Sequence, residues 1–453
     1  MPELSENFKK NLTGFLENYQ NFHTLRLHMP GHKGKSLIRS LAGAYAWDIT
    51  EIHGADSLFE ANGILKSAQQ ETARIYQTGA TFWSAGGSTL CIQAMLAQMK
   101  AEHRTILAAR TVHRAFLNSC VLLDLPVTWI FPRSGSLIGG YYDLSDFEKA
   151  LQQTSQPACI YVTSPDYLGN LQDIAGLSRI CRKYHARLIV DNAHGAHSAF
   201  LRENQHPIAN GADFCCDSAH KTLPALTGGA FLHVRNSEDA GKIQSHMQMF
   251  GSTSPSYLIM QSLESCTDWL AGQGREAIRQ CEEFAEQFKN QLSEKYELIG
   301  TDPMHLTIRV NGLEFSRILR ENYQIECEYA DKTCLVLLLS PMLTQQDFAR
   351  LSAVLLDFCP SGEFIPAQNP PELSRFAEIV CDLRTAALSD WEMIAPEQAE
   401  GRICAAVQVP CPPAVPIVLS GERITKETIA FMRFYDLDRI AVMKNIETNH
   451  QKF

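Results

Sequence analysis

The stretch Asp217-Ser218-Ala219-His220-Lys221-Thr222-Leu223-Pro224 places a hydroxyl, an imidazole and an amine next to one another on a predicted turn. It lies between two short apolar runs, residues 212–216 and 229–234, which are typical of buried strands. A lysine held away from bulk water has a lowered pKa and can form an imine with an aldehyde. Because an isolated lysine is usually a surface residue, this hypothesis for Lys221 requires partner residues elsewhere in the chain.

The composition is that of a globular protein with a large core. The chain has 453 residues, of which 45% are hydrophobic and 20% are charged, and its length favours two or three domains. A formal net charge of -10 argues against nucleic acid as the main partner and is compatible with a small cationic substrate. The sequence contains no apolar run of transmembrane length and begins without a signal-peptide pattern, so we expect neither a membrane span nor secretion.

The 14 cysteines are scattered and include no Cys-x-x-Cys pair. This usage favours a reducing cytoplasm over a disulfide framework, and no metal site is expected.

Residues 105–234 alternate short apolar runs with amphipathic stretches. This alternation predicts an α/β domain with a mostly parallel sheet, in which ligands bind beyond the carboxyl ends of the strands. The expected strands are 105–109, 127–131, 159–163, 187–191, 214–216 and 229–234, and the expected helices are 112–122, 144–153 and 174–185.

Upstream of this domain, Gly86-Gly87-Ser88-Thr89 precedes a strongly helical run at residues 90–99. Glycines let the backbone approach an anion, the hydroxyls donate hydrogen bonds, and a helix N-terminus adds free N–H groups. The motif therefore suits a phosphate group. An ordinary helix N-cap explains the same residues equally well when the motif is taken alone.

Three residues lie at or just beyond the ends of predicted strands. Asp191 ends an apolar strand, and a buried aspartate there needs a positively charged or protonated partner, although capping of the following turn is common. His194 follows it and could support the same site. His113 could stack on an aromatic ring or simply cap a turn.

Together these features fit pyridoxal 5′-phosphate (PLP). This cofactor needs an anion site for its phosphate, a partner for the face of its ring, a carboxylate for its pyridine nitrogen and an amine for its aldehyde. Ser218 and His220, beside the lysine, could make further phosphate contacts.

Beyond these residues, the sequence resembles the fold-type I PLP-dependent ornithine/lysine/arginine decarboxylase family, in its short form without an N-terminal receiver-like wing. The resemblance runs in the family's order from near the N-terminus to residue 425. It is carried by HMPGHKG (from His28), DITEIHGADSLFEANGI (from Asp48), GGSTLCIQAM (from Gly86), YVTSPDYLGNLQDI (from Tyr161), IVDNAHGAH (from Ile189), SAHKTLPALTGG (from Ser218), STSPSYL (from Ser252) and PCPPAVPIVLSGERIT (from Pro410).

The resemblance implies a role for each matching residue. Lys221 would form the Schiff base, Asp191 would face the pyridine nitrogen, and His113 would stack on the ring. His194 would lie near the ring substituents, and Thr253 would reach a phosphate across a dimer interface. The residues implied to hold the phosphate are Gly87, Ser88, Thr89, Ser218 and His220.

The implied fold is a PLP-binding large domain followed by smaller α/β parts. We expect an N-terminal helix and loop segment at 1–50, the large domain at 51–290, a small α/β domain at 291–360 and a decarboxylase-type C-terminal region at 361–453. Within these parts, helices are expected at 4–22, 64–77, 257–270, 275–292 and 372–388, a strand-helix-strand-helix order at 304–358, and a linker at 360–371.

The implied activity is decarboxylation of arginine, lysine or ornithine by a cytoplasmic homodimer of polyamine metabolism, with Lys221, Asp191 and His220 as catalytic residues. Acidic residues that could bind the distal cation of the substrate are Glu51, Asp56, Asp217 and, more weakly, Glu422.

The sequence departs from the family near the lysine. Asp217 stands where a glutamine is common, and Gly228-Gly229-Ala230 replaces a more polar run. These departures leave two alternatives open: an aminotransferase or lyase of the same fold, and a non-catalytic PLP-binding regulatory protein.

Overall fold

The computed structural model describes residues 11–136, 138–357, 367–369, 378–406 and 415–444. The chain divides into two compact units. The first contains residues 1–102, 173–288 and 339–349, and the second contains residues 103–172, 289–338 and 350–453. Among the described helices, none is both long enough and apolar enough to cross a membrane.

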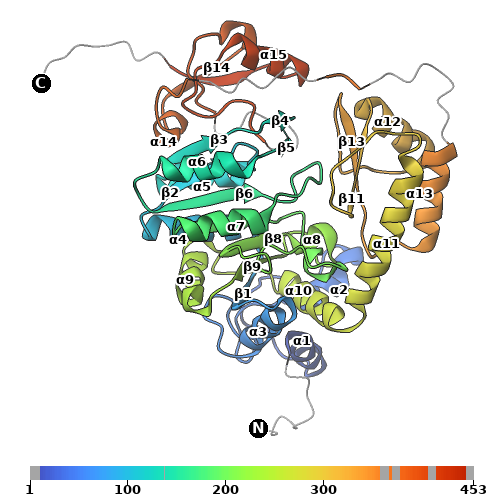
Figure 1. The fold of residues 1–453 in the computed structure, drawn as a ribbon. Helices are drawn as coiled ribbons and strands as arrows, with labels where there is room; N and C mark the ends of the chain where they lie inside the picture. The colour runs from blue at the N-terminus through green and yellow to red at the C-terminus, as the bar shows by residue number, and fades with distance from the viewer. Residues whose placement is uncertain (1–10, 137, 358–366, 370–377, 407–414, 445–453) are drawn as a thin grey trace, which may run out of the picture. The chain divides into compact units, whose positions relative to one another are not determined.

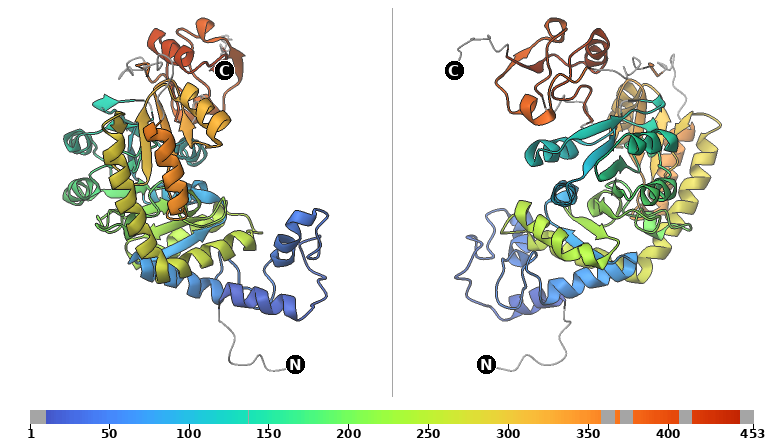
Figure 2. Two further views of the ribbon diagram at one scale, coloured as in Figure 1. Left: turned by 90° about the vertical axis from the view of Figure 1, so that its right-hand side faces the viewer. Right: turned by 60° about the vertical axis from the view of Figure 1, so that its left-hand side comes forward.

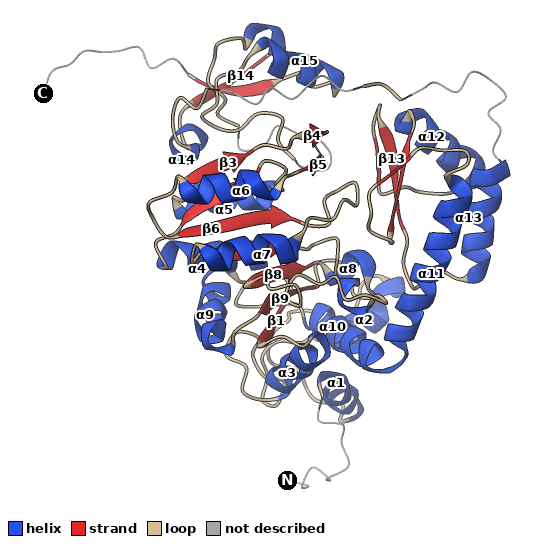
Figure 3. Cartoon of the chain, viewed as in Figure 1, coloured by secondary structure: helices blue, strands red, loops and turns tan. Residues whose placement is uncertain are grey.

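The main sheet has seven strands in the order β1-β9-β8-β7-β6-β2-β3 (Figure 3). β2 pairs in parallel with β3 and β6, and β7 pairs in parallel with β8, whereas β9 is antiparallel to both β8 and β1. The predicted α/β fold with a mostly parallel sheet is therefore confirmed. The strands are β1 (Ala80–Ser84), β2 (Thr105–Ala109), β3 (Val127–Ile130), β6 (Ala158–Thr163), β7 (Arg187–Asp191), β8 (Phe214–Asp217) and β9 (Ala230–Val234).

In the first unit, helices pack against the strands that carry the lysine and aspartate segments (Figure 1). α4 (Gly87–Ala101) contacts β1, β8 and β9, and most of its side chains are buried, as expected for an interior helix that is apolar nearly all round. α7 (Ile174–Lys183) contacts β7, and α3 (Ile64–Tyr76) contacts β1. The other long helices of this unit include α9 (Ala240–Phe250) and α10 (Tyr257–Trp269).

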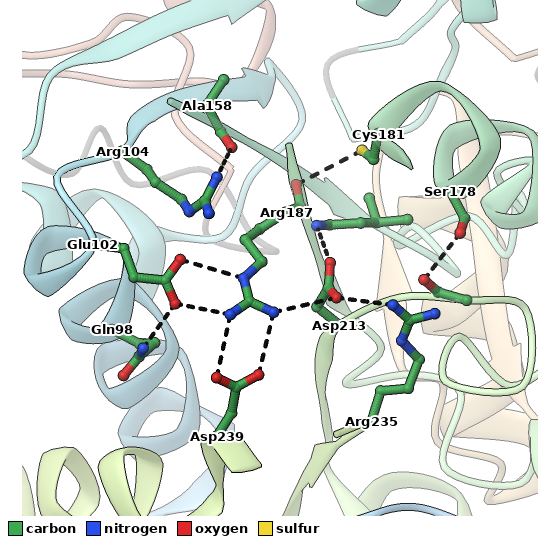
Figure 4. A network of polar contacts seen from close by, with 12 residues as sticks. Gln98, Glu102, Arg104, Ala158, Ser178, Cys181, Arg187, Asp213, Arg235 and Asp239 are labelled. Carbon is green, nitrogen blue, oxygen red and sulfur yellow. Dashed lines mark hydrogen bonds and ion pairs between the residues drawn. The ribbon is translucent and has the colours of Figure 1, made fainter. Parts of the chain in front are cut away.

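An ion-pair network holds the start of β7 (Figure 4). The guanidinium of Arg187 donates to both carboxylate oxygens of Glu102 (3.0 and 3.3 Å) and to both oxygens of Asp239 (3.2 Å each). It also lies 3.5 Å from Asp213, which accepts a second ion pair from Arg235 at 3.2 Å. Because these carboxylates come from separate parts of the chain, the network ties those parts to the strand that ends at Asp191.

Within the first unit, the N-terminal helix α1 (Leu12–Asn21) contacts α10 (Figure 2). The buried Glu264 of α10 accepts hydrogen bonds from the backbone N–H groups of Leu12 (2.8 Å) and Thr13 (2.7 Å), which have no partners within the helix. The structure thus confirms the expected N-terminal helix over its described part. Further along lie a 3₁₀ turn (Arg39–Leu41) and α2 (Ala42–Trp47).

In the second unit, α6 (Leu144–Gln152) packs on β2 and β3, and α5 (Arg114–Leu123) contacts α14 (Leu383–Ala387). A separate four-stranded antiparallel sheet has the order β10-β11-β13-β12. Its strands are β10 (Leu298–Ile299), β11 (His305–Arg309), β12 (Tyr329–Ala330) and β13 (Cys334–Leu338), and α12 (Gly312–Tyr323) packs on it. α11 (Arg275–Leu292) and α13 (Gln345–Asp357) contribute residues to both units.

Within the described residues, the expected helix at 372–388 is confirmed only at 383–387 and is wrong at 378–382. Ile379 forms an antiparallel bridge with Glu422, and helix α14 begins only after Asp382, whose side chain caps it through the N–H of Thr385 at 2.8 Å. This isolated bridge to a residue 43 positions further along the chain overrides the local helical preference at 378–382. Residues 372–377, and most of the expected linker at 360–371, lie outside the described residues.

The sequence interpretation also missed β14 (Trp391–Ile394) and β15 (Ile440–Met443), an antiparallel pair near the C-terminus, together with α15 (Lys426–Phe434).

Candidate active site

The predicted phosphate motif forms the beginning of α4. Gly87 adopts φ = +67° and donates its N–H to the carbonyl of Gly228 at 2.8 Å. A Cβ added at Gly87 would meet no atom within 4 Å, so the backbone is open to an approaching group there. The hydroxyl of Ser88 lies 2.7 Å from that of Ser218, and both serines are buried, whereas Thr89 is exposed. The two hydroxyls that the sequence assigned to one anion site therefore touch.

Lys221 lies on α8 (Ala219–Thr222), a short helix at the position of the predicted turn. Its amine lies 2.8 Å from Nε2 of His194, and the lysine is half-buried. Nδ1 of the neighbouring His220 lies 2.9 Å from the carbonyl of Gly229. The 228–229 backbone thus contacts both the start of α4, through Gly87, and α8, through His220.

Asp191 ends β7 and is 2% exposed. Its Oδ1 accepts hydrogen bonds from the N–H of Ala193 at 3.1 Å and from the thiol of Cys216 at 3.5 Å. Cys216 is its partner in register on β8. A carboxylate buried at a strand end and fixed by these donors has the chemistry required to accept a hydrogen bond from a protonated ring nitrogen.

Two other predicted site residues lie in different parts of the chain. His113 belongs to the second unit, where it is the N-cap of α5 and its Nδ1 accepts from the N–H of Ala115 at 3.1 Å. Thr253 is exposed in the segment between α9 and α10. Their proposed roles in ring stacking and across a dimer interface stay predictions.

Asp217 is wrong as a candidate for binding the distal cation of a substrate, because it is fully buried and directed into the core. Its Oδ1 accepts from the side-chain amide of Asn192 at 2.7 Å, and its Oδ2 lies 3.2 Å from Nε2 of both His206 and His233. Burial would raise the pKa of the Asp217 carboxyl, but the two histidines together hold this pKa well below its ordinary value.

The sequence interpretation did not find this cluster. His233 lay in a predicted buried strand and Asp217 directly followed another, which was the available signal. Nothing in the sequence indicated that His206 would join them.

Two other acidic residues have structural partners. The carboxylate of Asp56 accepts from the backbone N–H groups of Ser57, Asn62, Gly63, Leu65 and Lys66 at 2.8–3.3 Å and so caps the start of α3. Glu422, in the second unit, is buried and accepts from the N–H of Leu419 at 2.7 Å. Glu51 is half-buried and remains a candidate for binding the distal cation of a substrate.

The residues of the first unit fit PLP by their chemistry. Paired hydroxyls lie at an open helix N-terminus, an amine and an imidazole lie in contact, and a buried carboxylate ends the neighbouring strand. With the mostly parallel sheet, these features define a fold-type I PLP-dependent enzyme.

More specifically, the chain belongs to the Orn/Lys/Arg decarboxylase family. The family model of the major domain matches residues 11–312, and that of the C-terminal domain matches residues 383–440.

Several known proteins match the chain over most of their length. The chain is 27% identical to an arginine decarboxylase of Halalkalibacterium halodurans over 442 residues, which cover 90% of each chain. It is also 27% identical to an arginine decarboxylase of Bacillus subtilis, covering 93% of this chain and 92% of that one. The crystal structure of a Francisella novicida lysine decarboxylase matches with a TM-score of 0.82 and 16% identity, covering 97% of this chain and 82% of that one, which shows the fold.

Proposed function

We propose that this protein is a PLP-dependent decarboxylase that converts a basic amino acid, arginine, lysine or ornithine, to the corresponding amine and CO2. The observation that carries the proposal is the 2.7 Å contact between Ser88 and Ser218. It joins the open N-terminus of α4 to the residue three positions before Lys221, so an anion site and an amine lie on adjoining elements. Membership of the decarboxylase family and the arginine decarboxylase relatives support the reaction and the substrate class.

When bound, PLP supplies an aldehyde for a covalent link to Lys221 and a ring that accepts the electrons left when CO2 departs. Asp191 holds a proton on the pyridine nitrogen and stabilises charge that develops during the reaction, so it acts on turnover more than on substrate binding. His194 orients the amine of Lys221. Either His220 or Lys221 returns a proton to Cα of the product.

The phosphate is proposed to be held by Ser88, Thr89 and Ser218, with His220 and the backbone at Gly87 contributing further contacts. His113 is proposed to stack on the ring.

We further propose a homodimer, in which Thr253 of one subunit contacts the phosphate bound by the other. A run of exposed apolar side chains in the N-terminal segment supports this proposal. Leu25 and Leu27 are 79% and 83% exposed, and Leu37 is completely exposed. Exposed apolar side chains clustered in one segment indicate an interaction surface, and we propose that a second copy of the chain covers it. Light scattering should then give twice the monomer mass, and Leu27→Asp should lower it.

The proposed setting is the cytoplasm, where the amine product would enter polyamine metabolism. The 12 free cysteines among the described residues are compatible with a reducing compartment.

The test of function is incubation of the PLP-loaded protein with arginine, lysine and ornithine, with CO2 and the amine as measured products. Lys221→Ala should abolish both products and the visible absorption band of the bound cofactor, whereas Lys242→Ala, on α9, should change neither. A 2-oxo acid formed without CO2 would indicate an aminotransferase instead. A band that Lys221→Ala abolishes, without turnover of any amino acid, would indicate a regulatory PLP-binding protein.

A further inference from the structure

A buried polar cluster lies at the end of β8, shortly before Lys221 in the chain, and the function proposed above leaves it without a role. Asp217, His206 and His233 are each at most 1% exposed, and Asp217 is four residues before the lysine. The ring of Tyr76 packs against both histidines, with centroid distances of 5.3 and 4.4 Å. A fully buried carboxylate such as that of Asp217 destabilises the fold unless hydrogen-bond donors around it offset the loss of hydration.

We propose that Asp217 is a positioning residue that holds His194 against the amine of Lys221, an inference that rests on the cofactor chemistry proposed above. The connection runs through Asn192. The side-chain amide of Asn192 donates to Asp217 at 2.7 Å and to the carbonyl of Gly195 at 3.0 Å, so it fixes the short loop that contains His194. The imidazole of His194 in turn lies 2.8 Å from Nζ of Lys221.

The two histidines fix the carboxylate that begins this chain of contacts. An ionised carboxylate only accepts hydrogen bonds, so Nε2 of both His206 and His233 carries the proton. Nδ1 of His233 then accepts from the hydroxyl of Thr81 at 2.8 Å. Nδ1 of His206 is buried without a hydrogen-bond partner among the described residues. A proton on that Nδ1 would therefore have no acceptor among the described residues.

The same tautomer argument decides against a metal ion, although the three side chains offer ligand atoms within 4.8 Å of one another. A cation bound at Nε2 would move the proton of His206 to Nδ1, where no described group accepts it. A divalent ion would also leave net positive charge among fully buried groups, because the set contains a single carboxylate. Hydrogen bonding satisfies the cluster better than metal coordination.

The experiment uses the full chain with PLP and compares Asp217→Asn and Asn192→Ala with Asp213→Asn. Asp213 is a matched control because it is also a buried aspartate of the first unit. Its carboxylate accepts a hydrogen bond from the N–H of Leu188 and pairs with Arg187 and Arg235, so it has no contact with the two histidines or Asn192 among the described contacts. Three quantities are measured: PLP affinity by titration, the pH midpoint of the visible band, and thermal unfolding without cofactor.

We expect both Asp217→Asn and Asn192→Ala to weaken PLP binding about tenfold and to move the pH midpoint of the band by about one unit. Asp213→Asn should lose thermal stability but keep both cofactor properties. If the first two variants unfold earlier yet bind PLP with the wild-type affinity and midpoint, Asp217 is only structural and the inference fails. If Asp217→Asn does not fold, Asn192→Ala carries the test, because it leaves the carboxylate and both histidines in place.

Two further results would overturn the inference. The first is a stoichiometric metal in the purified protein that Asp217→Asn removes, detected by mass spectrometry. The second is a wild-type protein that gives no visible band with PLP. That result would refute the proposed function itself, whereas failure of the positioning role alone would leave the wild-type band in place.

Discussion

Replacing Arg187 by methionine tests how firmly the start of β7 must be held. The substitution keeps most of the side-chain volume but leaves the carboxylates of Glu102 and Asp239 without the guanidinium that now binds each through two oxygens. Asp213 keeps Arg235. The four side chains of the cluster around Arg187 are only 11–21% exposed. Water would therefore solvate the carboxylates of Glu102 and Asp239 poorly once the guanidinium is removed.

Removing one partner of a buried ion pair costs about 3–5 kcal/mol, and the residual exposure of Arg187 places this substitution near the lower end, at about 3 kcal/mol. For a unit of this size, that loss lowers the unfolding temperature by about 6–12 °C. The assay is differential scanning calorimetry at moderate salt, because high salt screens the charges that remain.

Arg235→Met is the matched control, since it removes a single contact to Asp213 and leaves that carboxylate paired with Arg187. It should cost about 1 kcal/mol or less. Equal losses for the two variants would refute the reasoning, because they would show that the shared guanidinium contributes no more than an ordinary surface ion pair.

Three further substitutions test the site and its support. Ser218→Ala should weaken PLP binding about tenfold in an equilibrium titration, because it removes the hydroxyl that contacts Ser88. The control Ser178→Ala removes an equally buried hydroxyl, which is bonded to a backbone carbonyl. It should lower stability without changing PLP affinity. Gly87→Ala should lower the free energy of unfolding by about 1 kcal/mol and should also lower PLP affinity, because φ = +67° strains any residue with a side chain. The control Gly241→Ala lies in α9 with open space around it. It should leave the unfolding temperature unchanged or raise it. Asp56→Asn should cost about 1–2 kcal/mol near neutral pH. Burial raises the pKa of Asp56, but the backbone N–H groups outweigh burial and lower this pKa. Its stabilising contribution is therefore complete above about pH 4 and is lost as the pH falls further, so urea unfolding should show the wild type and the Asp56 variant converging in acid.

The main sheet could be predicted from sequence where strands are short apolar runs with clear ends. The predicted boundaries 105–109 and 187–191 coincide with β2 and β7. β1 was not predicted as a strand because Ala80–Ser84 mixes polar and aromatic residues, and its partner β9 lies 150 residues further along the chain. Likewise, β14 pairs with β15 across almost 50 residues, which no local pattern could reveal.

The sequence placed Ser88 and Ser218 in one proposed phosphate site, and Lys221 and His194 in one proposed cofactor site. The structure brings the members of each pair into contact, while the assignment of the site stays a prediction. The sequence could not say which face of β8 borders the site. Adjacent residues of a strand point to opposite faces, so Cys216 contacts Asp191 while Asp217 points to the histidines. The division into four domains stays a prediction, as do the roles of His113 and Thr253.

The docking of α1 on α10 has a consequence for biosynthesis. The carboxylate that satisfies the first turn of α1 belongs to Glu264, 252 residues after Leu12. A ribosome adds about 5–20 residues per second, so the N-terminal helix leaves the exit tunnel roughly 13–50 s before Glu264 does. During that interval the nascent helix can neither dock nor complete its terminal hydrogen bonds, and its apolar face is available to a chaperone.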